Sequence, residues 1–176
     1  MTRRGMLAVG CLSAALIGAT AVPHAGAQTQ DDPELLGDFN DWAAYTYSTP
    51  KGKVCYIVAK PSSSEPKNVK RDPIFFLVTH RPGDKVRNEV STIIGYAFKK
   101  DEPATVTIDG TSYEMFTNGD GGWFDSSAKD SQVVNAMKAG KTLTVKGTSW
   151  RGTVTTDTYS LSGVTAALNK INETCK

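Results

Sequence analysis

The side chains of this 176-residue chain that are best suited to covalent or acid–base chemistry are three cysteines and two histidines. Thiolates and imidazoles act as nucleophiles, general bases and metal ligands. Cys11 and His24 lie in the first 27 residues, which have the layout of a removable leader. Any such chemistry in the mature protein would therefore depend on Cys55, Cys175 and His80.

Residues 1–27 have the three parts of a secretory signal peptide. Two arginines precede an apolar run over residues 6–22, and a small-residue Ala-Gly-Ala motif ends at Ala27. We expect cleavage between Ala27 and Gln28, and hence export. The alternative is an uncleaved membrane anchor, because the apolar run is near the minimum length that spans a bilayer. Its glycines, its serine and the proline that follows it disfavour that alternative.

Removal of the signal takes away two arginines and no acidic residue, so the mature chain has 18 basic and 18 acidic side chains. A neutral chain argues against nucleic acid binding and against electrostatic docking on membranes, both of which need basic surfaces. We expect no integral membrane segment after signal removal. The remaining residues are enough for one domain with one core.

The cysteine count predicts a disulfide between Cys55 and Cys175. Two cysteines in an exported chain favour pairing, because the compartment is oxidising. Cys175 lies on the apolar stripe of a helix predicted after residue 163, and Cys55 lies in VCYIVA, the pattern of a buried strand. Both thiols should therefore point inward. Two free buried thiols remain the alternative.

The sequence gives little support for a catalytic or metal-binding site. We expect His80, at the end of an apolar run, to be a hydrogen-bonded histidine near the surface. The sequence has no GxSxG, HExxH or CxxC motif, and one histidine with two oxidised cysteines is too few ligands for zinc. Residues 118–125 (NGDGGWFD) lack the order of a calcium-binding EF-hand, so we interpret them as a turn that feeds Trp123 and Phe124 into the core. These observations predict no catalytic residue, no metal and no cofactor.

The secondary-structure elements that carry these residues are predicted to be mostly strands. Short β-branched and apolar runs alternate with turn residues from Phe39 onward, after a polar leader over residues 28–38. We expect residues 39–176 to form an antiparallel β-sandwich or barrel-like domain of about eight strands with two peripheral helices, the last at the C-terminus. The first helix should begin with a capping box from Ser127 to Asp130. The polar stretch over residues 60–73 should be a surface loop.

Two threonine-rich runs near the end of the chain offer a possible binding face. Leu143 and Val145 should point inward and Thr142 and Thr144 outward, and Thr153 and Thr155 should lie on the outer face of the next strand. Threonine holds a flat hydroxylated surface at little cost in side-chain entropy, which suits a docked partner. The alternative is an ordinary solvated strand face.

Several stretches resemble the invasion-associated locus B (IalB) proteins of Gram-negative bacteria. They are DWAAYTY with VCYIVAKP, IFFLVTHRPGDKVRNEVS, IDGTSYEMFTNGDGGW, VVNAMKAGKTLTVKGTS and RGTVTTDTYSLSGVTAALNKINETC. The resemblance extends from about Phe39 to Cys175. It implies a mostly β protein of the cell envelope, in the periplasm or on the outer surface, with a link to host-cell invasion and with no catalytic residues to transfer.

Two classes of function follow. The first is a non-enzymatic protein that binds an envelope or host protein, and we expect this one. The second is a periplasmic enzyme or small-ligand carrier that uses a cleft in the β domain. An enclosed cavity with converging polar groups near His80 would favour the second class.

Overall fold

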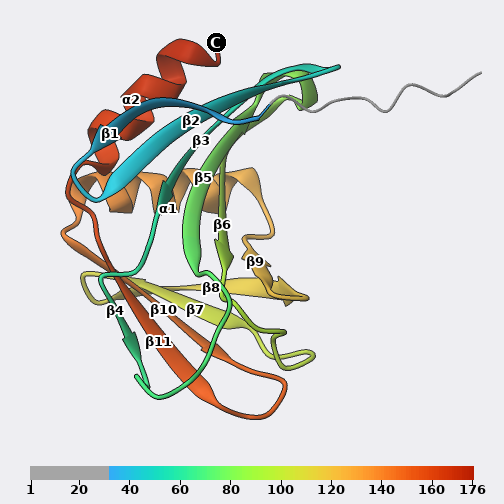
Figure 1. Cartoon of the computed structure of the whole chain (residues 1–176), viewed down its shortest axis with the longest axis vertical. Helices are drawn as coiled ribbons and strands as arrows, with labels where there is room; N and C mark the ends of the chain where they lie inside the picture. The colour runs from blue at the N-terminus through green and yellow to red at the C-terminus, as the bar shows by residue number, and fades with distance from the viewer. Residues whose placement is uncertain (1–31) are drawn as a thin grey trace, which may run out of the picture.

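Eleven antiparallel strands form one continuous sheet in the computed structural model, which describes residues 32–176, and two helices pack against it (Figure 1). The strand order is β1-β2-β3-β5-β6-β9-β8-β7-β10-β11-β4. The predicted signal peptide and its cleavage site between Ala27 and Gln28 lie outside the described residues.

The first half of the sheet contains β1 (Glu34–Phe39), β2 (Trp42–Thr49), β3 (Gly52–Ala59), β5 (Phe75–Arg81) and β6 (Val86–Ile93). The second half contains β7 (Ala104–Ile108), β8 (Thr111–Asn118), β9 (Gly121–Trp123), β10 (Thr142–Thr148), β11 (Val154–Ser160) and β4 (Ser63–Glu65). The helices are α1 (Ser127–Ala139), α2 (Val164–Thr174) and the short 3-10 helix η1 (Pro82–Asp84).

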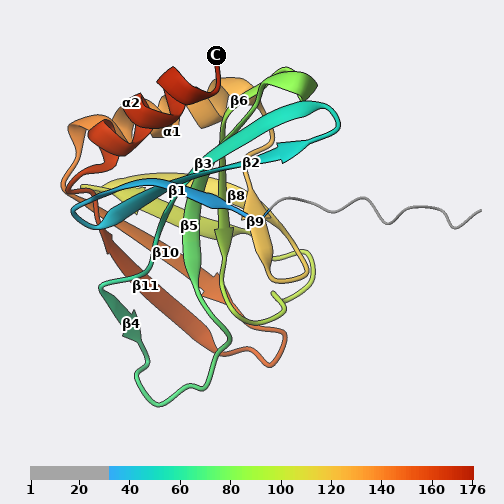
Figure 2. The same ribbon diagram turned by 45° about the horizontal axis from the view of Figure 1, so that its top comes forward.

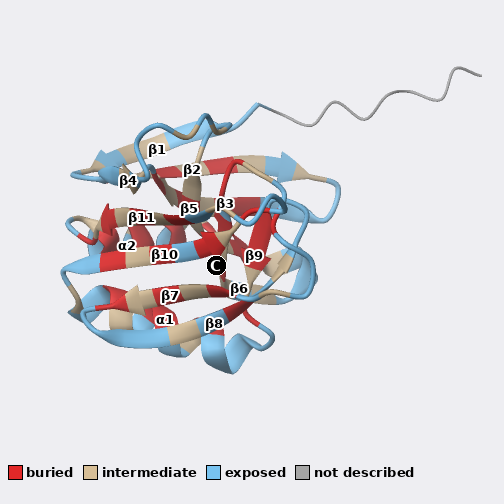
Figure 3. Cartoon of the chain, turned by 90° about the horizontal axis from the view of Figure 1, so that it is seen from below, coloured by how far each residue is buried: buried red, intermediate tan, exposed pale blue. Residues whose placement is uncertain are grey.

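The sheet curls so that its two halves enclose one core together with α1 and α2, as two views of the ribbon show (Figures 1 and 2). Apolar residues at every second position give a strand one apolar face, which must be buried. Because the sheet curls, the apolar faces of its two halves pack against each other. At one end the indole N–H of Trp42 in β2 donates to the carbonyl of Ser160 in β11 at 3.0 Å. Seen from below, buried and less buried positions alternate along β7, β10 and β11 (Figure 3).

The predicted fold class is confirmed, with a higher strand count than expected. The additional strands are short or irregular: β4 and β9 have three residues each, and β1 contains a bulge between Leu35 and Gly37. Segments of that length give almost no periodic signal, because two or three positions cannot establish alternation.

The prediction of a leader over residues 28–38 is wrong for its last part. Residues 34–38 belong to β1, which pairs with β2 along its length. Leu36 and Phe39 pack against the core, so their burial holds this segment to the sheet.

The helix predicted from residue 127 begins there, but its cap differs from the capping box that we expected. Ser126 is the N-cap, and its hydroxyl oxygen accepts a hydrogen bond from the Lys129 N–H at 3.4 Å. Asp130 does not reach back to the cap. Its carboxylate is buried and accepts the backbone N–H of Val90 in β6 at 3.0 Å, so it joins the helix to the sheet.

Cys55 and Cys175 form a disulfide, with their Cα atoms 6.0 Å apart. The predicted stripe of the last helix is also present, because Val164, Ala167, Leu168 and Ile171 are all buried. The disulfide joins the end of α2 to β3 and closes a loop across a sequence separation of 120 residues.

Candidate binding surface

The outer face of β2, β3 and β5 is apolar and only half buried. Along β2, Trp42 and Ala44 point into the core, whereas Ala43, Tyr45 and Tyr47 alternate with buried neighbours and are partly exposed. The same alternation in β3 and β5 places Tyr56, Val58, Phe75 and Leu77 on this outer face. Cross-strand pairing brings these positions side by side, since Tyr45 faces Tyr56 and Val58 faces Leu77.

An open groove of about 760 Å³ lies on this face. Its floor is formed by Tyr45, Tyr56, Val58, Phe75 and Leu77. We call this surface the aromatic groove. Its walls come from the end of β1, from the turn between β1 and β2 and from the segment that follows β3. They carry polar groups: Asp38, Asn40, Asp41, Lys60 and Ser62.

Two tyrosines of the groove floor, Tyr45 and Tyr56, form a cluster with Tyr47. The rings of Tyr45 and Tyr56 stack, with centroids 5.4 Å apart and planes 16° apart. Tyr47 packs edge-on against Tyr56 at 6.3 Å. Burial, with a smaller contribution from the two neighbouring tyrosines, raises the pKa of Tyr56, so its hydroxyl stays protonated at neutral pH. Such rings offer a large rigid contact area with a polar edge.

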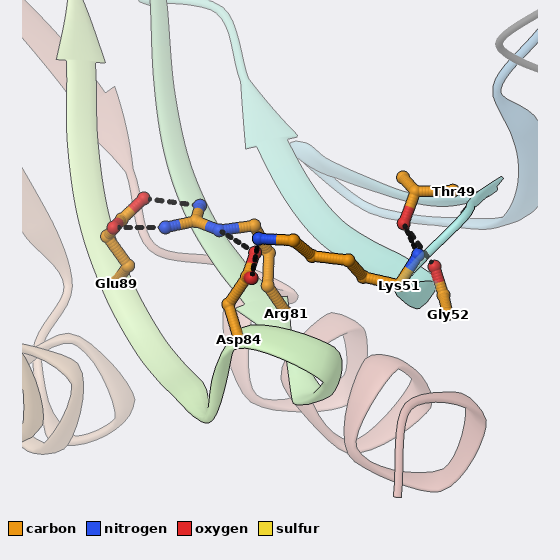
Figure 4. Close-up of polar contacts among 6 residues, drawn as sticks. All are labelled: Thr49, Lys51, Gly52, Arg81, Asp84 and Glu89. Carbon is orange, nitrogen blue, oxygen red and sulfur yellow. Dashed lines mark hydrogen bonds and ion pairs between the residues drawn. The ribbon is translucent and has the colours of Figure 1, made fainter. Parts of the chain in front are cut away.

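A chain of charges holds the opposite end of the same strands together (Figure 4). The Lys51 ammonium contacts Asp84 at 2.7 Å, and the Arg81 guanidinium makes two hydrogen bonds of 2.7 and 2.6 Å to Glu89. The hydrogen bonds to Glu89 raise the pKa of Arg81, and the hydrogen bond from Lys51 lowers the pKa of Asp84.

The same two turns are also in direct backbone contact. A side chain at Gly83 would meet the carbonyl oxygen of Lys51 at 1.9 Å. Only glycine lets the two backbones come so close, and the turn between β5 and β6 therefore packs directly against the β2–β3 hairpin. The strands that form the groove floor are thereby fixed relative to one another.

His80 is not the surface histidine that we expected. It is fully buried, because its strand runs under α2, where the ring meets Asn172. Its Nε2 lies 2.9 Å from the Asn172 Oδ1, and its Nδ1 accepts the backbone N–H of Asn88 at 3.1 Å. Burial lowers the pKa of His80, so the ring is neutral with its proton on Nε2. Both ring nitrogens are engaged, and the ring joins α2 to the sheet.

The four threonines proposed as a binding face do not all share that face. Thr142 and Thr144 point outward and Leu143 and Val145 inward, as predicted. Thr155 is only 1% exposed, so its predicted outward orientation is wrong. Its hydroxyl bonds the Tyr96 hydroxyl at 2.7 Å inside the molecule. Thr153 precedes β11, in the turn, where its N–H donates to the Ser149 hydroxyl.

The outward hydroxyls of the second half instead form a row in cross-strand register. Thr144 lies between Thr107 of β7 and Thr158 of β11, and the row ends in Ser112 of β8 and Ser63 of β4. We call these five residues the hydroxyl row. Sequence reasoning found only Thr144 of it, because β-strand order is not visible in the sequence.

The polar stretch over residues 60–73 is more than the surface loop that we expected. Its start forms a wall of the aromatic groove, and β4 adds a strand to the sheet. Near its end, the Arg71 guanidinium is almost completely buried and pairs with Asp157 at 2.6 Å. Nothing in the local sequence marks this arginine, since it lies among lysines, prolines and serines.

The glycine-rich segment 118–125 forms the tight β8–β9 hairpin. Phe124 enters the core as predicted, but Trp123 is half exposed and stacks on Phe116 at 5.9 Å. The Trp123 ring lies over Gly121, so the turn folds it onto the sheet surface. Within residues 32–176, no group of three or more histidine, cysteine, aspartate or glutamate side chains is arranged to hold a metal ion.

The family model for invasion associated locus B (IalB) protein matches residues 42–172, which includes every strand that forms the floor of the aromatic groove. The chain belongs to the IalB family. The fold agrees with that assignment. The crystal structure of invasion associated protein B from Bartonella henselae is similar, with a TM-score of 0.54 over 82% of this chain and 98% of that chain. The two sequences are 16% identical, so this likeness shows the fold alone.

A search of curated proteins found no match. In the part of the chain from residue 32 to the end, neither helix has the length and apolar character needed to cross a membrane.

Proposed function

We propose that this IalB family protein is exported to the cell envelope and acts by binding another protein through the aromatic groove, without catalysis. The groove itself is the observation that supports the proposal. It exposes a cluster of aromatic and aliphatic side chains on strands that are fixed at both ends. Aromatic residues on a rigid support are typical anchors of protein interfaces.

The charges of the groove indicate what the partner presents. Asp38 and Asp41 are exposed at the walls, against one basic residue, Lys60. The partner should therefore place apolar side chains on the tyrosine floor and a basic side chain near the two carboxylates. The partner is an envelope protein or a host-cell protein, and the second case would account for the link to invasion in the family's name.

Export is supported by the signal-peptide layout and by the disulfide. Disulfides of this kind persist in oxidising compartments. The mass of the intact protein from a periplasmic extract should match a chain that begins at Gln28. A membrane-bound protein that retains residues 1–27 would contradict export with cleavage.

The absence of catalysis is supported by the state of His80. Its two nitrogens are used inside the fold, and it lies on the opposite face of the sheet from the groove residues Leu77 and Phe75. A general base needs a free nitrogen within reach of a substrate proton.

Leu77→Asp tests the proposal, because it places a carboxylate on the groove floor and leaves the inner core unchanged. Thr144→Lys on the hydroxyl row is the matched control. In affinity capture from intact envelopes, the wild type and Thr144→Lys should retain the same partner and Leu77→Asp should lose it. If only Thr144→Lys lost the partner, the binding site would be the hydroxyl row and not the aromatic groove. Retention by all three folded proteins would exclude the groove.

A small-ligand carrier is the second candidate, favoured by the groove's volume. About 760 Å³ lies within the range of small-molecule sites. Native mass spectrometry of protein purified from periplasm separates the two. A co-purifying small molecule that Leu77→Asp loses would support the carrier.

A further inference from the structure

The turn between β10 and β11 carries the most exposed large hydrophobic side chain of the described residues. Trp150 is 62% exposed, and Val154, at the start of β11, is 47% exposed. Views of the ribbon from two angles place this turn at the end of the molecule opposite α2 and the C-terminus (Figures 1 and 2). We call it the Trp150 turn.

Backbone hydrogen bonds hold the Trp150 turn in one conformation. The Ser149 N–H donates to the Thr153 carbonyl at 2.8 Å, and the Thr153 N–H donates to the Ser149 hydroxyl oxygen at 3.1 Å. The Trp150 N–H donates to the Ala97 carbonyl at 2.9 Å, which joins the turn to the segment between β6 and β7. These bonds fix the backbone of the turn, and the Trp150 side chain that it carries is mostly exposed.

One cation packs on the indole, and two lysines lie in the segment that adjoins the turn. The Arg151 guanidinium lies 4.7 Å from the centre of the Trp150 ring. Lys99 and Lys100 come from the adjoining segment, which bonds β10 through the Lys99 N–H and the Thr148 carbonyl at 2.8 Å.

The carboxylates beside these cations offset them only in part. Glu102 pairs with Lys99 at 2.9 Å, and Asp101 is the other acidic residue of the segment. Across residues 32–176, no carboxylate lies within 4.0 Å of Lys100 or Arg151. Although the mature chain is neutral overall, the turn has a local excess of positive charge that acts over about 10 Å.

We propose that the Trp150 turn docks this protein on the surface of a bilayer that contains anionic phospholipids. A tryptophan ring prefers the headgroup level of a membrane, where its apolar body is buried and its N–H remains hydrated. Lys100 and Arg151 would lie beside lipid phosphates. A narrow convex turn suits a membrane surface better than a protein, whose stable interfaces bury about 800 Å² on each side.

Sedimentation with lipid vesicles tests this proposal. The mature disulfide-bonded protein is mixed with phosphatidylcholine vesicles that contain phosphatidylglycerol, and with vesicles of phosphatidylcholine alone. The bound fraction should be larger with phosphatidylglycerol and should fall with added salt. The single variants Lys100→Gln and Arg151→Gln should each lower the partition coefficient for the anionic vesicles roughly fivefold.

Trp150→Ala should lower binding to the anionic vesicles by a similar or larger factor. Phe116→Ala, which removes a 52% exposed aromatic ring from β8, should leave binding unchanged. Leu77→Asp should also bind vesicles normally, since docking does not involve the aromatic groove. Absence of wild-type binding, equal binding to both vesicle types, or unchanged binding of Trp150→Ala would each overturn the proposal. Capture of a protein that depends on Trp150, without vesicle binding, would also overturn it.

Discussion

Arg71 and Asp157 form a buried ion pair across 86 residues of sequence, with guanidinium–carboxylate hydrogen bonds of 2.7 and 2.6 Å. The Arg71 Nε also donates to the Ile94 carbonyl at 2.9 Å, and the guanidinium lies 5.0 Å from the centre of the Tyr96 ring. Bidentate arginine–carboxylate pairs fix the relative orientation of the two side chains as well as their distance. This one anchors the segment that carries β4 and a wall of the aromatic groove to the inner face of β11.

Removing Arg71 should strongly destabilise the fold. Arg71→Met leaves the Asp157 carboxylate buried without its partner, which typically costs about 3–5 kcal/mol. Chemical denaturation of the disulfide-bonded protein measures the change. Lys70→Met, at the exposed neighbouring position, should change the free energy of unfolding by less than about 0.5 kcal/mol. Equal stability of the two variants would show that the pair is unimportant.

Loss of the disulfide should also lower stability. Cys175→Ser should cost about 2–5 kcal/mol, because the unfolded chain regains the freedom of a very long loop. Cys55→Ser should cost a similar amount, and the double variant should be scarcely worse, since each single change already breaks the same bond. Thermal melts with and without reductant measure this. Unchanged melting of the wild type in reductant would contradict the prediction.

Asp130 should give the protein a pH-dependent loss of stability. Burial raises the pKa of Asp130 from 3.8 to about 6 in the folded protein. Its protonated form is therefore favoured by folding, and that contribution is complete below pH 3.8 and lost as the pH rises through about 6.

Asp130→Asn measures this effect. Its side-chain oxygen can still accept the Val90 N–H, and it has no charge to bury. The free energy of unfolding of the variant, relative to that of the wild type, should rise between pH 4 and pH 6. At neutral pH the variant should remain more stable by about 1–2 kcal/mol. Denaturation curves at several pH values check this difference. A difference that is constant across the range would contradict it.

Thr155→Lys should destabilise the fold and Thr144→Lys should not, although both replace a strand threonine. Thr155 is buried beside Tyr96, so an ammonium there would lose its hydration and break the hydroxyl pair, with a cost of at least about 3 kcal/mol. Thr144 is partly exposed on the hydroxyl row and should tolerate lysine within about 0.5 kcal/mol. Circular dichroism melts distinguish them. Normal melting of Thr155→Lys would contradict the inward orientation.

The features that depend on local periodicity could be predicted from the amino-acid sequence alone. The last helix, its apolar stripe and the alternation of Leu143 and Val145 with Thr142 and Thr144 all follow from side-chain spacing. The family resemblance and the fold class were also available, because several motifs in a fixed order are more specific than any one of them. The spacing of apolar residues constrains an element directly, so these predictions needed no knowledge of its neighbours.

Which face of a strand points inward, and which distant residues meet, depends on how the strands and helices pack together. The alternation of side chains along a strand places Thr155 and Asp157 on one face of β11, but both faces of that strand are polar enough to look exposed. The burial of Asp157 depends on Arg71, and the burial of His80 depends on Asn172 in the last helix. A polar side chain can be buried only where a partner satisfies it, and these partners come from other strands and helices. The aromatic groove has the same origin, since three strands that are not all consecutive must pair before its floor exists.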